Sequence, residues 1–272
     1  MSDFEAADGT PLFFCERGEG VPVLALAGLT RTSQDFDYVA PHLDGVRLIA
    51  MDYRGRGRSG RADPASYTIP QEAADALALM DHLGLERAAI LGTSRGGLIA
   101  MVLAAQATDR LTGVALNDIG PEIAEAGLEA IKGYLGRRPA AKTFDEAVAM
   151  RAKLMAGFED VPESRWREEV EKHYTEAPDG LEITYDAALR EAVLGDGAQP
   201  APDLWPLFDG LEGLPLCAIR GANSDLLAPE TFAEMQRRRP DMIAVEVPKR
   251  GHVPFLDEPE AVAALRDWVG RL

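Results

Sequence analysis

The chain has 272 residues, which is enough for one or two domains and for a large core that needs no disulfide or metal to hold it. Hydrophobic residues make up 46% of the sequence and charged residues 27%, and this composition excludes a mainly disordered chain. The net charge of −17 repels phosphate backbones and anionic lipids, so we expect neither a nucleic acid nor a membrane as a partner.

The cysteines and the N-terminus bear on the compartment. Cys15 and Cys217 lie far apart, and we expect buried free thiols rather than a disulfide. The first five residues are acidic and lack the basic stretch and apolar run of a signal peptide. The longest apolar stretch, residues 98–105, is much shorter than the roughly 18 residues of a membrane span. We therefore predict a cytoplasmic protein.

Short apolar runs alternate with longer helical stretches along most of the chain. The runs that predict strands are residues 21–27, 46–51, 88–91, 111–116, 214–219 and 242–247. The stretches that predict helices between and after them are residues 69–83, 96–107, 229–239 and 259–269. Strands that are apolar almost throughout are typical of a sheet covered on both faces. This alternation predicts an α/β fold with a mostly parallel central sheet flanked by helices.

The alternation stops for about 85 residues in the middle of the sequence. Residues 121–206 are charged and contain helical patterns at 144–158, 164–174 and 185–193. We interpret this segment as an inserted helical cap over the carboxyl ends of the strands. Residues 1–120 and 207–272 then form the core.

Gly92-Thr93-Ser94-Arg95-Gly96 is the strongest chemical signal in the sequence. It has the form G-x-S-x-G, and it lies between an apolar strand and an apolar helix, which is the context of a nucleophile elbow. A sharp strand-to-helix turn exposes the serine hydroxyl, and its crowded backbone requires glycine on both sides. We expect Ser94 to be a nucleophile; a tight turn with a capping serine is the alternative.

A serine hydroxyl needs a base beside it, and the base needs a carboxylate to orient it. His252 follows the last predicted strand, at the sheet edge that also carries Ser94, and it is the expected base. His42, His82 and His173 fit less well. Asp225 follows the fifth predicted strand and is the expected acid, with Asp118 after the fourth strand as the runner-up.

Acyl transfer also needs two donors for the oxyanion. The backbone N–H of Arg95, directly after the nucleophile, is the first expected donor. The second is the N–H of Leu29, in the loop after the first long predicted strand.

Together these motifs resemble the α/β-hydrolase fold superfamily. The resemblance rests on Ala27-Gly28, on residues 52–59, on the elbow at 92–97, on residues 221–225 and on Gly251-His252. It implies a triad in the chain order Ser94, Asp225, His252, an oxyanion hole at Leu29 and Arg95, and a variable cap. Many relatives have His-Gly where this chain has Ala27-Gly28.

Three rival interpretations are weaker. Gly55 to Gly60 matches G-x-G-x-x-G, but a dinucleotide site needs a helix to begin there, and the predicted helix begins only near residue 69. The arginines around this motif lack the interleaved aromatic residues of a nucleic-acid surface. No His, Cys or carboxylate group has metal-ligand spacing, so we expect neither a metal nor a cofactor.

We therefore expect a serine esterase or lactonase that acts on a small molecule through an acyl-enzyme. Arg31, Trp166 and Trp205 are candidate substrate contacts, and Arg95 could also pair with an anionic substrate. One alternative is hydrolysis of a carbon–carbon bond in a diketone of the meta-cleavage type. The other is a ligand-binding module on a hydrolase scaffold. The sequence leaves the oligomeric state open.

Overall fold

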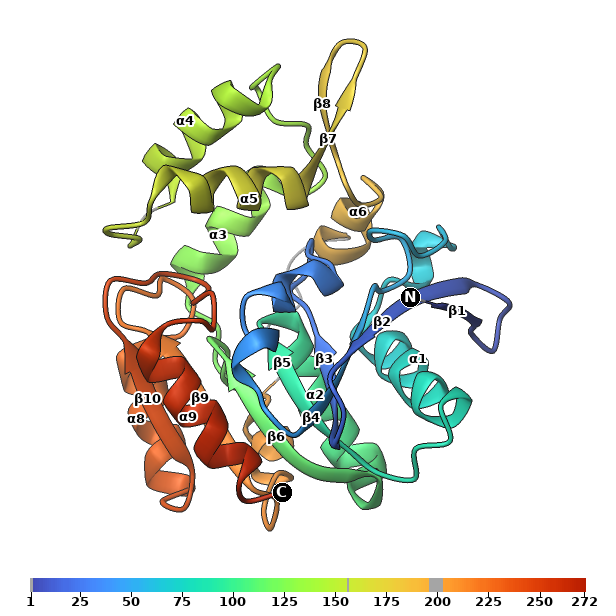
Figure 1. Cartoon of the computed structure of the whole chain (residues 1–272), viewed down its shortest axis with the longest axis vertical. Coiled ribbons are helices and arrows are strands. Elements are labelled where there is room, and N and C mark those ends of the chain that lie inside the picture. Colours follow the sequence, from blue (N-terminus) through green and yellow to red (C-terminus); the bar gives the residue numbers. More distant parts are fainter. Residues whose placement is uncertain (1, 156, 196–202) are drawn as a thin grey trace.

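The computed structural model describes residues 2–155, 157–195 and 203–272, and they fold around one large sheet (Figure 1). Its strands lie in the order β1-β2-β4-β3-β5-β6-β9-β10. From β4 to β10 neighbouring strands are parallel, whereas β1 and β2 pair antiparallel at one edge. The strands are β1 (Ser2–Glu5), β2 (Pro11–Arg17), β3 (Val21–Leu26), β4 (Val46–Met51), β5 (Ala88–Thr93), β6 (Leu111–Asn117), β9 (Leu216–Gly221) and β10 (Ile243–Val247). The predicted α/β architecture is therefore confirmed, with two N-terminal strands that the prediction lacked.

The central strands carry apolar side chains on both of their faces, so an apolar cluster forms on each side of the sheet. Leu24 and Leu26 of β3 pack into one cluster, together with α1, α2 and α8. Val23 and Ala25 of the same strand pack into a second cluster with α9, whose Trp268 is fully buried. The helices of this framework are α1 (Ile69–His82), α2 (Arg95–Ala107), α8 (Pro229–Arg238) and α9 (Pro259–Val269), with 3₁₀ turns at Ser33–Asp37, Ala40–His42, Pro64–Ser66 and Thr108–Arg110.

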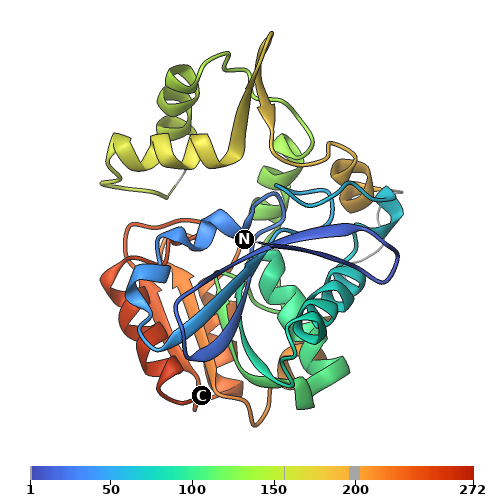
Figure 2. The same cartoon turned by 45° about the vertical axis from the view of Figure 1, so that its right-hand side comes forward.

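The part of the chain from α4 (Phe144–Leu154) to β8 (Gly180–Ile183), between β6 and β9, lies beyond the carboxyl ends of the strands, as both views show (Figures 1 and 2). Three helices of the segment between β6 and β9 correspond to predicted ones, namely α4, α5 (Glu163–His173) and α6 (Leu189–Leu194). The sequence did not predict the other two described helices, α3 (Glu125–Tyr134) and α7 (Trp205–Asp209). It also did not predict the hairpin of β7 (Tyr174–Ala177) and β8. Residues 156 and 196–202 of the predicted cap lie outside the described residues.

Apolar packing and ion pairs join this segment to the core. Trp166 and Phe158 pack edge-on and tilted against Phe255, which lies in the loop after β10. Beside them, Arg165 of α5 pairs with Asp257 of the same loop at 2.5 Å. The segment is thus tied to the loop that also carries His252.

Two further expectations concern the cysteines and the membrane. Cys15 and Cys217 are both free and buried, as predicted. None of the helices in the described part of the chain is long and apolar enough to cross a membrane. Within the same residues no cluster of three or more His, Cys, Asp or Glu side chains could hold a metal ion.

Candidate active site

Ser94 lies in the turn between β5 and α2, with backbone angles that L-residues rarely adopt. Its φ is +50° and its ψ is −114°, which is a strained conformation typical of functional turns. Neither flanking glycine has room for a side chain, because other backbone atoms lie too close. A Cβ on Gly92 would lie 2.5 Å from the carbonyl oxygen of Gly96, and a Cβ on Gly96 would lie 1.9 Å from the carbonyl oxygen of Leu26. The turn therefore has the crowded geometry expected of an elbow.

A continuous line of hydrogen bonds runs from this serine to a buried carboxylate. His252 Nε2 lies 3.0 Å from Ser94 Oγ. On its other side, His252 Nδ1 lies 2.7 Å from Oδ2 of Asp118. If Nδ1 carries the proton and donates it to the carboxylate, Nε2 is free to accept the proton of the serine hydroxyl. These three residues have the geometry of a nucleophile, a base and an acid.

The acid in this arrangement is Asp118, whereas the sequence favoured Asp225. Both follow neighbouring parallel strands, β6 and β9, so both begin at the same edge of the sheet. Asp118 is the first residue after β6, and its side chain is fully buried against His252. Asp225 lies four residues beyond the end of β9, is exposed, and makes no hydrogen bond with His252. The intervening loop carries it away from the site, so the expectation for Asp225 is corrected.

Asp118 is held by the very loop in which Asp225 was expected to act. Oδ1 of Asp118 accepts from the backbone N–H of Gly221 at 2.8 Å. Its Oδ2 accepts from Ser224 Oγ at 2.6 Å, in addition to His252. These hydrogen bonds fix the carboxylate in place beside His252.

The loop that carries His252 is fixed by a second carboxylate. Glu258 accepts from the backbone N–H groups of Phe255 and Leu256 at 3.1 and 2.9 Å, and its Oε1 also lies 2.7 Å from Nε of Arg250. Because Arg250 and Leu256 lie on either side of His252, these bonds restrain both ends of its loop.

The two expected oxyanion donors lie on either side of the elbow. Arg95 is the first residue of α2, so its N–H has no acceptor within the helix. Gly28 brings the other loop close, since a Cβ there would lie 3.9 Å from Ser94 Cβ. The Gly28 carbonyl accepts from Arg31 N at 3.1 Å, which turns the N–H of Leu29 to the opposite side of that peptide. The roles of Leu29 and Arg95 stay predictions.

The arginine side chains that could have met an anionic substrate are already paired. Arg95 Nε lies 2.5 Å from Oε2 of Glu72, and its Nη2 donates to the Tyr67 carbonyl at 3.0 Å, so this buried side chain faces α1. Arg31 Nε donates to Asp35 at 2.6 Å, and its Nη2 donates to Glu169 of α5 at 3.0 Å. Arg31 is therefore a link between the core and the cap segment.

The two tryptophans expected in the pocket have other places. Trp166 is only 4% exposed and lies in the apolar cluster inside the cap segment. Trp205 begins α7, donates from Nε1 to Glu122 at 2.8 Å and packs against Phe208. Both rings are taken up by contacts with other residues of the chain, so the expectation that Trp166 and Trp205 contact substrate is corrected. The sequence placed these residues in the right segment but carried no signal for the direction of their side chains.

The glycine-rich loop after β4 is a structural turn. No helix begins at its glycines, since α1 starts at Ile69. A Cβ on Gly57, where φ is +53°, would lie 2.2 Å from Oδ2 of Asp52. Asp52 in turn accepts from the backbone N–H groups of Ser33 at 2.7 Å and Arg58 at 2.9 Å. The glycines let this loop close over a buried carboxylate.

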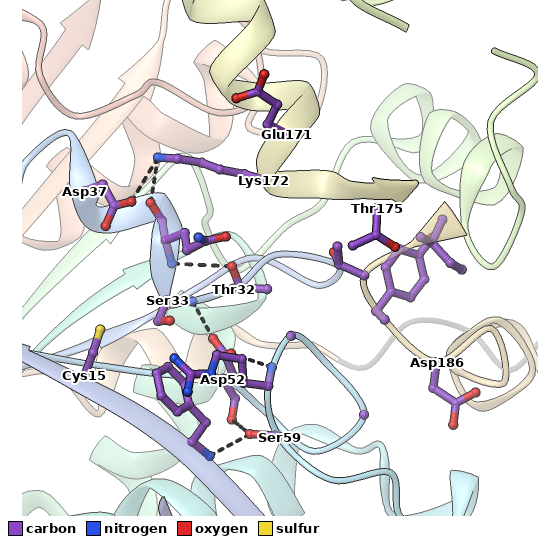
Figure 3. A pocket seen from close by; sticks show the side chains of 18 of the residues that line it. Cys15, Thr32, Ser33, Asp37, Asp52, Ser59, Glu171, Lys172, Thr175 and Asp186 are labelled. Atoms are coloured by element: carbon purple, nitrogen blue, oxygen red, sulfur yellow. Dashed lines mark hydrogen bonds and ion pairs between the residues drawn. The ribbon is translucent and has the colours of Figure 1, made fainter. Parts of the chain in front are cut away.

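A pocket of about 580 Å³ opens beside this loop, between it and the end of α5 (Figure 3). Asp52 and Ser33 lie on its floor, and Lys172 reaches across to Asp37. Neither Ser94 nor His252 lines it. The pocket is therefore separate from the hydrogen-bonded line of the candidate triad.

A sequence model described as the alpha/beta hydrolase family matches residues 23–265. The chain belongs to the alpha/beta hydrolase family. It is 39% identical over 246 residues to a 3-hydroxybutyrate-oligomer hydrolase of Cupriavidus necator, covering 87% of this chain and 84% of the relative. It is 27% identical to a 2-(acetamidomethylene)succinate hydrolase of Mesorhizobium japonicum, covering 87% and 83%.

Solved structures agree with the family. A crystal structure of an alpha/beta hydrolase from Novosphingobium aromaticivorans superposes with a TM-score of 0.92 at 35% identity, over 100% of this chain and 98% of that one. The predicted membership and fold are confirmed. The similar proteins are named as hydrolases, which supports a hydrolase and leaves the ester or lactone class to the proposal that follows.

Proposed function

We propose that the protein is a serine hydrolase that cleaves an ester of a small-molecule substrate through an acyl-enzyme. The observation that carries this proposal is the line of contacts from Ser94 Oγ to His252 Nε2 at 3.0 Å and from His252 Nδ1 to Asp118 at 2.7 Å. A serine is a weak nucleophile without such a base, and no other histidine in the described chain contacts Ser94.

In this mechanism Ser94 Oγ attacks the ester carbonyl carbon while its proton passes to His252 Nε2. The imidazolium that forms is stabilised by the carboxylate of Asp118, and the N–H groups of Arg95 and Leu29 hold the oxyanion. Collapse of the tetrahedral intermediate breaks the bond to the alcohol oxygen, which takes the proton from His252. Water then attacks the acyl-enzyme, gives its proton to His252, and releases the acid and free Ser94. No step needs a metal or a cofactor.

The identity of the ester is drawn from similarity. The relative from Cupriavidus necator, at 39% identity over most of both chains, is a 3-hydroxybutyrate-oligomer hydrolase. We propose that this chain acts on the same class, namely short oligoesters of 3-hydroxy acids. Their repeating ester bond and small branched acyl group need no large pocket.

Hydrolysis of a panel of substrates by the protein and its Ser94→Ala variant tests the proposal. The panel holds the dimer and trimer of 3-hydroxybutyrate, a simple alkyl ester, a lactone and a coloured ring-fission dienone. We expect turnover of the oligoesters by the parent and none by the variant. Preferred loss of the dienone's colour would instead indicate carbon–carbon bond hydrolysis. If the folded parent hydrolyses none of these substrates, the result would favour a ligand-binding module.

A further inference from the structure

Arg151 of α4 points from the cap segment into a group of charged side chains shared with the core. This group, the arginine cluster, comprises Arg31, Asp35, Arg151, Glu169 and His173. Within the described residues the Arg151 guanidinium makes no hydrogen bond: the carboxylate that it faces, on Glu169, lies 3.6 Å away, and its buried Nε has no partner. A buried guanidinium normally uses its planar set of donors, so this one has donors to spare.

Arg31 holds one oxygen of each carboxylate near Arg151, whereas Oε1 of Glu169 is buried and has no hydrogen-bond partner in the described part of the chain. Arg31 takes up Oδ2 of Asp35 at 2.6 Å and Oε2 of Glu169 at 3.0 Å. Arg31 also lies 2.5 Å from Nε2 of His173, which must accept and is therefore neutral. Burial, followed by repulsion from Arg31, lowers the pKa of Arg151. A further anion beside Arg151 would relieve that repulsion and use its free donors.

The arginine cluster begins next to the candidate nucleophile. Cγ of Arg31 lies 3.0 Å from the position of a Cβ on Gly28, and that same position lies 3.9 Å from Cβ of Ser94. Arg31 then reaches Glu169, and Arg151 faces the same carboxylate oxygen. The arginine cluster thus runs from the loop beside Ser94 to Arg151 of the cap segment. Arg151 keeps about 15% of its side chain exposed.

Tyr134, at the end of α3, lies near the same charges. Burial raises the pKa of its hydroxyl, and the positive charges of Arg31 and Arg151 oppose that rise. An aromatic ring near these two arginines offers an apolar surface for the carbon chain of a substrate whose charged end meets them.

We propose that Arg151 binds a free carboxylate on the substrate, so that the preferred esters are those that carry a carboxylate a few carbons from the scissile bond. This inference rests on the proposed ester hydrolysis and names a part of its specificity. An oligoester of a 3-hydroxy acid carries such a group at its acid end. The protein's net charge of −17 repels anions overall, so a local arginine is needed for their recognition.

The test compares two pairs of esters, and one member of each pair carries a carboxylate that the other lacks. In the first pair, 3-acetoxybutyrate carries its carboxylate on the alcohol side of the ester, and its primary amide is the neutral partner. In the second pair, 4-nitrophenyl hemisuccinate carries its carboxylate on the acyl side, and 4-nitrophenyl butyrate is the neutral partner. Rates are measured for the full-length parent, Arg151→Gln, Arg151→Lys and the control Arg167→Gln. Arg167 lies on α5 and pairs with Asp145 at the surface, which makes it a matched arginine away from the arginine cluster.

We expect the parent to prefer the charged member of at least one pair. Arg151→Gln should lose about 10- to 100-fold in kcat/KM on that member, through KM, and at most about threefold on its neutral partner. Arg151→Lys should keep part of the preference because it keeps the charge, and Arg167→Gln should match the parent.

Equal losses on charged and neutral esters would show that Arg151 only holds the cap segment, and they would overturn the proposal. A parent that hydrolyses neutral esters as well as charged ones in both pairs would overturn it too, and would leave ester hydrolysis standing. A folded parent that hydrolyses no ester would overturn the proposed function and this inference with it.

Discussion

Replacing Asp118 by Asn separates the carboxylate that the structure places beside His252 from the one that the sequence favoured. Asn fits the position, because it tolerates the left-handed backbone of Asp118, whose φ is +53°. In the parent, the Gly221 N–H donates to Oδ1 of Asp118 at 2.8 Å, and the amide oxygen of Asn can accept the same hydrogen bond. The amide nitrogen then faces Nδ1 of His252 and donates to it.

This exchange reverses the tautomer of the base. Nδ1 becomes an acceptor, the ring proton moves to Nε2, and Nε2 can no longer take the proton of Ser94. The imidazolium of the transition state also loses its counter-ion at 2.7 Å. We expect kcat to fall by about 10³- to 10⁴-fold, which is roughly 4–5.5 kcal/mol of barrier.

The assay is steady-state hydrolysis of the best ester, with Asp225→Asn as the matched control. Asp225 is exposed, so its variant should stay within about twofold of the parent. Circular dichroism and thermal unfolding check that both variants fold. A parent-like kcat for Asp118→Asn together with a large loss for Asp225→Asn would refute the assignment of the acid.

Three further variants test the framework of the site. Gly57→Ala should lower the free energy of unfolding by about 2 kcal/mol, because its Cβ would lie 2.2 Å from a carboxylate oxygen at a φ of +53°, as measured by urea unfolding. Glu72→Gln should cost about 3 kcal/mol in the same measurement, since Glu72 is fully buried between two arginines at 2.8 and 2.5 Å. Burial and two nearby arginines hold the pKa of His173 well below its usual value, so the unfolded chain takes up this proton first as the pH falls. Stability should therefore fall below about pH 6.5, by up to about 2 kcal/mol between pH 7 and pH 5, and His173→Gln should weaken that fall in thermal unfolding.

Each of these variants has a control. Gly133→Ala lies in a helix where a Cβ meets nothing within 4 Å, and it should leave stability unchanged or raise it by up to about 1 kcal/mol. Glu129→Gln removes an exposed partner of Lys132 and should cost about 0.5 kcal/mol or less. Losses at Gly57 or Glu72 no larger than at these controls would contradict the packing described. An unchanged pH dependence in His173→Gln would show that His173 is not held neutral.

The parts of the site that follow directly from a strand end could be predicted from the sequence. The elbow at Ser94 combines a motif with a strand before it and a helix after it, and His252 follows the last parallel strand. Asp118 and Asp225 both follow neighbouring strands, and strand order alone does not choose between them. A direct signal was present, because Asp118 comes immediately after its strand whereas three residues separate Asp225 from the end of its strand.

Other features depend on tertiary contacts that a single sequence does not encode locally. Strand β1 is four residues long and has a single buried side chain, Phe4, so its pattern was too short to recognise. The hairpin of β7 and β8 has only Leu181 buried. Arg151 had no motif around it, and its interest arises only where α4 meets α5 and the loop after β3. The boundaries of the cap at residues 121 and 206 stay a prediction.

The central claim is that Ser94 is a nucleophile activated by His252. Its most direct test is the intact mass of the protein after incubation with a fluorophosphonate, beside Ser94→Ala and His252→Ala. This probe needs an activated serine and no knowledge of the substrate. We predict a single adduct on the parent, none on Ser94→Ala, and slow labelling of His252→Ala. An adduct that persists in Ser94→Ala, or a folded parent that also resists a small apolar sulfonyl fluoride, would contradict the account.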